Sequence, residues 1–344
     1  MTKILVISDD GLPSGFGRIS SEINLRLIRR GYEVLAASLT YDGLLPAQYD
    51  GMPLPYHVAA LNGREWVGAT AQIINAWQPD IITVIQDFPY AVAIRNAPLD
   101  WSKHGFIIIT PVDGVPIHPD WLNTMRQADA GLTISEFGVN AFRQAGIQVG
   151  LCRPGVNLDK FYLLSDDKRV EVRQKLGIDR DAFVLGVMAM NQGRKSILQM
   201  CKAFFDFAID KPTARILLDM DLKQQFDIEA ACQQFGWDRT KIIGRLECIQ
   251  HGVLELRERY NVLDTHAVLA FREGYGLPIV EAMACGIVSI AQAYCAGTEQ
   301  LRDNRGVLIG SLDYFLPSTW GGALDRLPDY RELTVKLQWL YDNP

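Results

Sequence analysis

The sequence predicts an α/β protein made of two parallel-sheet units. Short β-branched runs alternate with amphipathic helical stretches, and this alternation stops and restarts near the middle of the chain. The length of 344 residues corresponds to two domains of about 150 residues each, and the 48% hydrophobic content supplies apolar side chains for two cores. Continuous apolar strands separated by helices are typical of parallel sheets that are covered on both faces.

The first unit is expected to cover residues 1–160. Within it, the stretch Arg18–Arg30 places Ile19, Ile23, Leu27 and Ile28 on one face, which predicts an amphipathic helix. The strands expected in this unit are the runs Ile4–Ile7, Glu33–Ser38, Ile81–Ile85, Phe106–Thr110 and Gly131–Ile134.

The second unit is expected to cover residues 161–344. Pro154-Gly155 and the polar stretch Leu164–Lys175 are interpreted as a linker between the units. Ligands of open α/β sheets bind at the carboxyl ends of the strands, so we expect the two units to share a ligand cleft. The strands expected in this unit are Phe183–Met190, Ala214–Leu218, Lys241–Ile243, His266–Phe271 and Ile287–Ile290.

The charge pattern argues against two classes of function. The formal charge is −6, and it is divided evenly between the two halves of the chain. General nucleic-acid binding needs clustered Lys and Arg, so it is not expected, and binding to an anionic membrane is expected to be peripheral at most. The six cysteines lack C-x-x-C spacing, and no apolar run approaches the length of a membrane span. These features predict a soluble, cytoplasmic protein with reduced thiols.

The most informative segment is Arg272–Gly286, which follows an apolar run and opens a helical pattern. Glu273 and Glu281 stand eight positions apart in it, and Gly274 and Gly276 follow the first acid. The glycines allow backbone amides at a helix start to approach a ligand closely, which is typical of phosphate sites. Amides for phosphates and carboxylates for hydroxyls together suit a nucleotide sugar.

This segment resembles the E-x7-E motif of family-four (group 1) glycosyltransferases, which are retaining enzymes of the GT-B fold. The resemblance implies that Glu273 meets hydroxyls of the donor sugar and that Glu281 holds the ribose. A tight turn with nothing bound is the structural alternative. The amides implied to lie beside the sugar and the diphosphate belong to Gly274, Tyr275, Gly276 and Leu277.

A second segment resembles the turn with which the family grips phosphate. Lys195 matches the family's lysine, whereas Asn191 or Ala189 stands where the usual arginine is expected. Arg194 lies beside the lysine, so Arg194 and Lys195 are the expected cationic pair, with Asn191 as a hydrogen-bond donor. The alternative is a pair of solvated cations at a helix start, but two cations there oppose the helix dipole unless an anion is bound.

Two further segments lie in the first half. Gly15, Phe16 and Gly17 resemble the family's N-terminal glycine loop, which faces the donor phosphates and the acceptor, although an ordinary glycine turn is the alternative. Asp113 stands where many members carry an acceptor-side histidine, and it could accept a hydrogen bond from the acceptor or act as a weak base. His118 is a second candidate there, and a turn-forming role is the alternative for Asp113.

The pair Asp219 and Asp221 fits the D-x-D signature of metal-dependent glycosyltransferases of the other main fold. It lies deep in the second unit, beside segments that already supply positive charge, so we interpret it as a polar strand end. Neither a metal nor a cofactor is expected, and the resemblance implies a nucleoside-diphosphate sugar as the donor.

The resemblance therefore implies a retaining, metal-independent transfer of a sugar to an acceptor hydroxyl. A sugar-nucleotide epimerase of the same fold and a non-catalytic nucleotide-sugar-binding protein are the alternatives. The segments Pro154–Phe161 and Ala296–Glu299 extend the resemblance to about residue 310. The family usually continues with a helix that crosses back to the first unit, and here the chain ends soon after Leu337–Tyr341.

Overall fold

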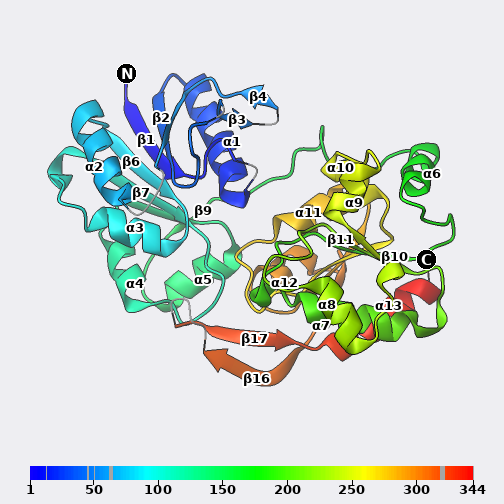
Figure 1. Cartoon of the computed structure of the whole chain (residues 1–344). Coiled ribbons are helices and arrows are strands. Elements are labelled where there is room, and N and C mark those ends of the chain that lie inside the picture. Colours follow the sequence, from blue (N-terminus) through cyan, green and yellow to red (C-terminus); the bar gives the residue numbers. More distant parts are fainter. Residues whose placement is uncertain (13, 45, 50, 62–64, 318–321, 344) are drawn as a thin grey trace. The chain divides into compact units, whose positions relative to one another are not determined.

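The chain folds into two α/β units, which the computed structural model describes for all residues except 13, 45, 50, 62–64, 318–321 and 344 (Figure 1). Unit 1 covers Met1–Pro154 and includes Gly322 and Ala323, and unit 2 covers Gly155 onward apart from that short segment. Each unit has its own sheet and its own core.

Unit 1 is built on a seven-stranded sheet in the order β5-β2-β1-β6-β7-β8-β9, in which all neighbouring strands are parallel. Its strands are β1 (Lys3–Ser8), β2 (Glu33–Ser38), β5 (His57–Ala60), β6 (Ile81–Ile85), β7 (Gly105–Thr110), β8 (Ala130–Thr133) and β9 (Gly150–Leu151). Its helices are α1 (Gly15–Arg29), α2 (Trp66–Trp77), α3 (Phe88–Arg95), α4 (Pro119–Arg126) and α5 (Glu136–Gln144), and β3 (Gln48–Tyr49) pairs with β4 (Met52–Pro53).

The five strands expected in this unit are present within one or two residues of their predicted bounds. The edge strands β5 and β9 were not expected, because each is short and carries little of the apolar pattern that identifies a buried strand. The helix expected over Arg18–Arg30 is present as α1, and its apolar residues Ile19, Ile23, Leu27 and Ile28 are half-buried. The residues that α1 buries are Gly17, Ser20, Ser21 and Asn24, because this face packs against a polar cluster around Asp10.

Unit 2 has a six-stranded parallel sheet in the order β12-β11-β10-β13-β14-β15. Its strands are β10 (Val184–Val187), β11 (Arg215–Leu218), β12 (Ile242–Gly244), β13 (Thr265–Val268), β14 (Val288–Gln292) and β15 (Val307–Ile309). Its helices are α6 (Asp166–Lys175), α7 (Ile197–Phe207), α8 (Ile228–Phe235), α9 (Arg245–Gln250), α10 (Leu256–Asn261), α11 (Leu277–Ala284), α12 (Ala296–Leu301) and α13 (Tyr330–Asp342).

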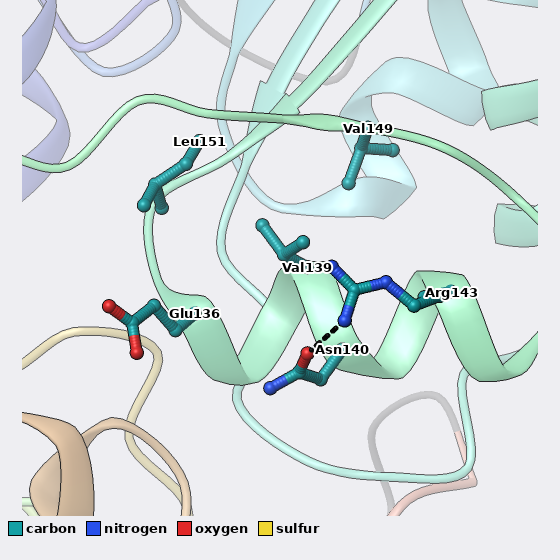
Figure 2. Close-up of a pocket in the computed structure, with 6 residues that line it drawn as sticks. All are labelled: Glu136, Val139, Asn140, Arg143, Val149 and Leu151. Atoms are coloured by element: carbon teal, nitrogen blue, oxygen red, sulfur yellow. Dashed lines mark hydrogen bonds between the residues drawn. The ribbon is translucent and has the colours of Figure 1, made fainter.

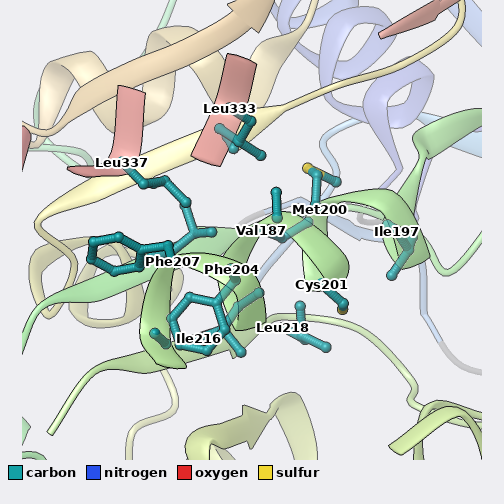
Figure 3. Packing of buried hydrophobic residues seen from close by; sticks show 14 of the residues in the cluster. Val187, Ile197, Met200, Cys201, Phe204, Phe207, Ile216, Leu218, Leu333 and Leu337 are labelled. Atoms are coloured by element: carbon teal, nitrogen blue, oxygen red, sulfur yellow. The ribbon is translucent and has the colours of Figure 1, made fainter. Parts of the chain in front are cut away.

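The last helix belongs to the core of unit 2. Leu333 and Leu337 of α13 are fully buried against a cluster that includes Phe204 and Phe207 of α7 (Figure 3). The hydroxyl of Thr334 also donates to the carbonyl of Ala203 at 3.3 Å. Burial of two leucines stabilises this packing by about 1.5–3 kcal/mol for each side chain.

The polar stretch 164–175 is not a linker, and this expectation was wrong. It contains α6, which begins at the N-cap Ser165. Arg169 and Arg173 of this helix form ion pairs of 2.7 Å with Asp264, and Arg173 is only 3% exposed. The charges of this stretch therefore include ion pairs that fix α6 to Asp264, with Arg173 buried, rather than belonging to a fully solvated segment.

A two-stranded antiparallel hairpin, β16 (Ser311–Pro317) and β17 (Leu324–Pro328), precedes α13. It is visible in orange and red in Figure 1. The alternating pattern of the sequence did not reveal this hairpin.

Candidate functional site

The candidate site lies at the carboxyl ends of the two central strands of the unit 2 sheet, β10 and β13. Strands β10 and β13 are parallel neighbours, so the turn that follows β10 and the loop that follows β13 begin at the same edge. The first connection leads through a short 3-10 turn, Gly193–Lys195, into α7. The second leads through Glu273 and Gly276 into α11. This topology brings together two segments that are far apart in the sequence.

Both helices start without a side-chain cap. Gly276 precedes α11 with a φ of 86°, in the left-handed region that glycine tolerates, and Ser196 precedes α7 with a φ of 51°. A Cβ on Gly276 would lie 2.9 Å from Cδ1 of Ile279. Neither helix has an acidic residue in its first turn. The partial positive charge of both N-termini is therefore not offset by a local carboxylate, which favours an anion.

Lys195 and Glu273 form an ion pair that joins the two segments. Their side chains are only 14% and 17% exposed. Burial by itself raises the pKa of Glu273, but the charges of Lys195 and Arg194 and a hydrogen bond from the Tyr275 amide hold this pKa below its usual value. Glu273 is therefore ionised at neutral pH and can accept hydrogen bonds from hydroxyls.

Arg194 ties the same two segments together through their backbones. Its Nη1 donates to the carbonyl of Arg272 at 3.3 Å, and the amide of Phe271 donates to the carbonyl of Arg194 at 2.8 Å. The guanidinium consequently lies close enough to Glu273 to lower its pKa. The predicted cationic pair and the first acid of the E-x7-E segment thus lie together.

Asn191 has a structural task in this turn. It is fully buried, and its Nδ2 donates to the carbonyls of Asp221 at 2.9 Å and Phe226 at 2.8 Å. Its Oδ1 accepts from the amide of Phe226 at 3.2 Å. Both N–H groups of the side chain are used by the backbone. Asn191 therefore shapes the turn, and its direct contact with a donor stays a prediction.

Glu281 lies on α11 and is 3% exposed. Its Oε2 accepts a hydrogen bond of 2.8 Å from the hydroxyl of Tyr260 in α10. The second acid of the motif is therefore held within the protein by a specific donor. The sequence pattern identified Glu281 but not Tyr260, because the spacing of residues along one helix contains no information about α10.

The D-x-D pair is held by protein groups. Asp219 is buried, and its carboxylate lies 2.7 Å from Nε of Arg245 and 3.3 Å from Nε of Arg259. Asp221 accepts the amide of Lys223 at 2.8 Å. Across the described part of the chain, no group of three or more His, Cys, Asp or Glu side chains is arranged to hold a metal ion.

In unit 1, the glycine loop forms the start of α1. The hydroxyl of Ser14 accepts the amide of Gly17 at 2.9 Å as a helix cap. A Cβ on Gly17 would lie 2.3 Å from the carbonyl oxygen of Leu12 and 2.6 Å from that of Asp9. The glycine at 17 is therefore required by close backbone packing, and Gly15 and Phe16 open the helix beside it. Contacts of Gly15, Phe16 and Gly17 with a donor stay predictions.

Asp113 follows β7 and is half-buried, and its contact with an acceptor stays a prediction. His118 caps α4, since its Nδ1 accepts the amide of Asp120 at 3.2 Å. Asp10, which follows β1, is buried and accepts hydrogen bonds from Tyr56 at 2.7 Å and Asn24 at 3.0 Å. Burial raises the pKa of Asp10 above its usual value.

A separate cavity of about 410 Å³ lies on unit 1, between α5 and β9 (Figure 2). Val139, Val149 and Leu151 give it apolar walls, and Nη1 of Arg143 donates to Oδ1 of Asn140 at 2.9 Å on its rim. None of the residues that line it was predicted as a site residue. The sequence contains no motif that would have indicated it.

The two Rossmann-like units define the GT-B fold, and solved structures share it. Sucrose-phosphate synthase from Thermosynechococcus elongatus superposes with a TM-score of 0.74 at 17% identity, covering 100% of this chain and 90% of that one. The Anabaena protein Alr3699/HepE, solved in complex with UDP and glucose, gives a TM-score of 0.70 at 18% identity with the same coverage. At these identities the similarity establishes the fold.

Residues 168–313 match the protein family described as glycosyl transferases group 1. This match confirms the expected resemblance over most of unit 2. A curated relative, the D-inositol 3-phosphate glycosyltransferase of Geodermatophilus obscurus, is 28% identical in an alignment of 193 positions that covers 52% of this chain. The aligned region spans 40% of the length of that relative. No helix among the described residues is long and apolar enough to cross a bilayer.

Proposed function

We propose that this protein is a retaining glycosyltransferase that moves a sugar from a nucleoside diphosphate to an acceptor hydroxyl without a metal ion. The observation that carries the proposal is the buried Lys195–Glu273 ion pair beside two uncapped helix N-termini. This arrangement offers positive charge for a diphosphate and a carboxylate for sugar hydroxyls within one small region. The family match over residues 168–313 supports the same reaction class.

Cleavage of the bond between sugar and phosphate builds positive charge on the sugar and negative charge on the leaving diphosphate. Lys195, Arg194 and the backbone amides at the start of α11 would stabilise the leaving group. One well-placed donor to a developing anion lowers the barrier by roughly 3–4 kcal/mol, so fixed cations can replace a metal ion. The HepE structure, which holds UDP and glucose, supports a nucleotide-sugar donor.

The stereochemical part of the proposal rests on the resemblance to group 1 enzymes. In such a reaction the leaving phosphate takes the proton of the acceptor on the same face of the sugar. No strong protein base is then required, and Asp113 would only orient the acceptor hydroxyl. We also propose a cytoplasmic location, because the six cysteines are all free and five are buried.

The test measures nucleoside diphosphate release from UDP-, GDP- and ADP-sugars with a panel of acceptors. The anomeric configuration of the product is then read by NMR, and the reaction is repeated with a metal chelator. A product with the configuration of the donor, formed at an unchanged rate with chelator, supports the proposal. Inversion, or dependence on a divalent ion, contradicts it.

The placement of Asn191 supports a second candidate, a non-catalytic nucleotide-sugar-binding protein. Asn191 stands where the family usually carries an arginine. Its side-chain amide donates to two backbone carbonyls of the protein. Such a protein would be stabilised by its matched nucleotide, by about 2.7 kcal/mol at 100 times the Kd, without releasing product. A sugar-nucleotide epimerase would instead convert the donor alone, which NMR of the donor would detect.

A further inference from the structure

We propose that Asp325, on strand β17, is a positioning residue that holds the loop carrying Glu273 in its working geometry. This inference rests on the proposed function, because it concerns the donor side of the same site. Asp325 forms an ion pair with Arg272, the residue immediately before Glu273. The side chains of Arg272 and Asp325 are only 6% and 15% exposed. Separating the partners of such a buried pair is costly, so the pair resists displacement of the loop.

The hairpin touches this loop through its backbone as well. The amide of Arg326 donates to the carbonyl of Phe271 at 3.3 Å, one residue from the ion pair. The side-chain amide of Gln292, at the end of β14, donates to the carbonyl of Arg326 at 3.0 Å. The hydroxyl of Tyr294 donates to the carbonyl of Leu324 at 3.1 Å. Strand β17 is therefore fixed on both sides of Asp325.

The loop held in this way carries the groups proposed to act on the donor. Its Phe271 amide and Arg272 carbonyl bind Arg194, and its Glu273 side chain binds Lys195. The carbonyl of Glu273 also accepts the amide of Ala296 at 3.3 Å. A displacement of the loop would therefore move the carboxylate and the guanidinium together. A shift of about 1 Å at such groups can reduce the rate about 100-fold.

The experiment compares Asp325→Asn with Asp264→Asn. Asp264 serves as the control, because this partly buried carboxylate forms ion pairs with Arg169 and with the buried Arg173 in the same unit, and its described ion pairs do not involve the loop. Donor and acceptor kinetics are measured below the melting temperature of every variant. We expect D325N to lower the donor kcat/KM about 10- to 100-fold. The acceptor KM should stay unchanged, and D264N should only lower the melting temperature.

Two further variants keep the test decisive. Asp325→Glu retains the charge and should recover donor kcat/KM to within about threefold of the wild type. If D325N does not fold, the double variant R272M/D325L removes both charges without leaving one buried alone, and the same loss is expected from it. Wild-type donor kinetics in D325N or in the double variant, or equal losses in D325N and D264N, would overturn the inference. A wild-type protein that neither binds nucleotide nor releases it would instead refute the proposed function.

Discussion

The hydroxyl of Tyr260 donates a 2.8 Å hydrogen bond to Oε2 of Glu281, and both side chains are almost completely buried. Tyr260 lies on α10 and Glu281 lies on α11, so the bond joins two helices of unit 2. A carboxylate at this depth depends on each donor it receives, because an uncompensated charge in the interior is costly.

Tyr260→Phe is therefore expected to lower the free energy of unfolding by about 1–3 kcal/mol, because the buried carboxylate loses a donor. Urea denaturation measures this change. Tyr49→Phe is the matched control, since its hydroxyl donates to Glu22 at 2.9 Å, where the acceptor side chain is 36% exposed. The control should lose less than about 1 kcal/mol. Equal losses in both variants would show that burial of Glu281 does not set the energy of this bond.

Lys195→Ala is expected to lower kcat about 100- to 1000-fold, because it removes one donor to the developing charge on the diphosphate. Glu281→Ala should instead raise the donor KM strongly. Steady-state kinetics separate the two effects. Lys202→Ala is the control, because Lys202 lies on α7 but pairs with Asp206 at the surface. Near-wild-type kinetics in both K195A and E281A would contradict the assignment of the site.

Gly17→Ala and Gly68→Ala should change stability in opposite directions. A Cβ at position 17 meets two backbone carbonyl oxygens, so this variant should lose about 1–3 kcal/mol. A Cβ at position 68, within α2, meets nothing within 4 Å. That variant should gain about 0.5–1 kcal/mol from helix propensity. Thermal denaturation compares them, and a stabilised G17A would refute the close packing at the start of α1.

The buried His266 should make stability depend on pH. Burial lowers the pKa of His266 to about 3, while the unfolded chain has a pKa of about 6.5. The unfolded state therefore binds more protons between these values, and stability falls as the pH drops below 6.5, by at most about 1.4 kcal/mol per pH unit. His266→Gln should flatten the slope between pH 6 and 4.5, measured by urea denaturation at each pH. His251→Gln, at an exposed position, should leave the slope unchanged.

Much of the fold was predictable because parallel sheets leave a strong local signal. Strands such as β2 and β6 are apolar and bounded by helical patterns, and their limits agree with the prediction to the residue. The stretch 164–175 was wrongly predicted to be a linker. A charged sequence has the same local pattern whether its side chains are solvated or form ion pairs within the protein. Only the partner carboxylate of Asp264, which lies far along the chain, distinguishes the two cases.

The sequence by itself determined the α/β class, the two units and the residue types of the candidate site, because helix and strand periodicity and the E-x7-E spacing are local. The tertiary structure alone decided which groups meet. It paired Lys195 with Glu273, placed Tyr260 on Glu281 and set Asp325 against Arg272. Each of these contacts joins different elements of the fold. Their geometry depends on strand order and on the packing of loops at one sheet edge, which no local pattern encodes.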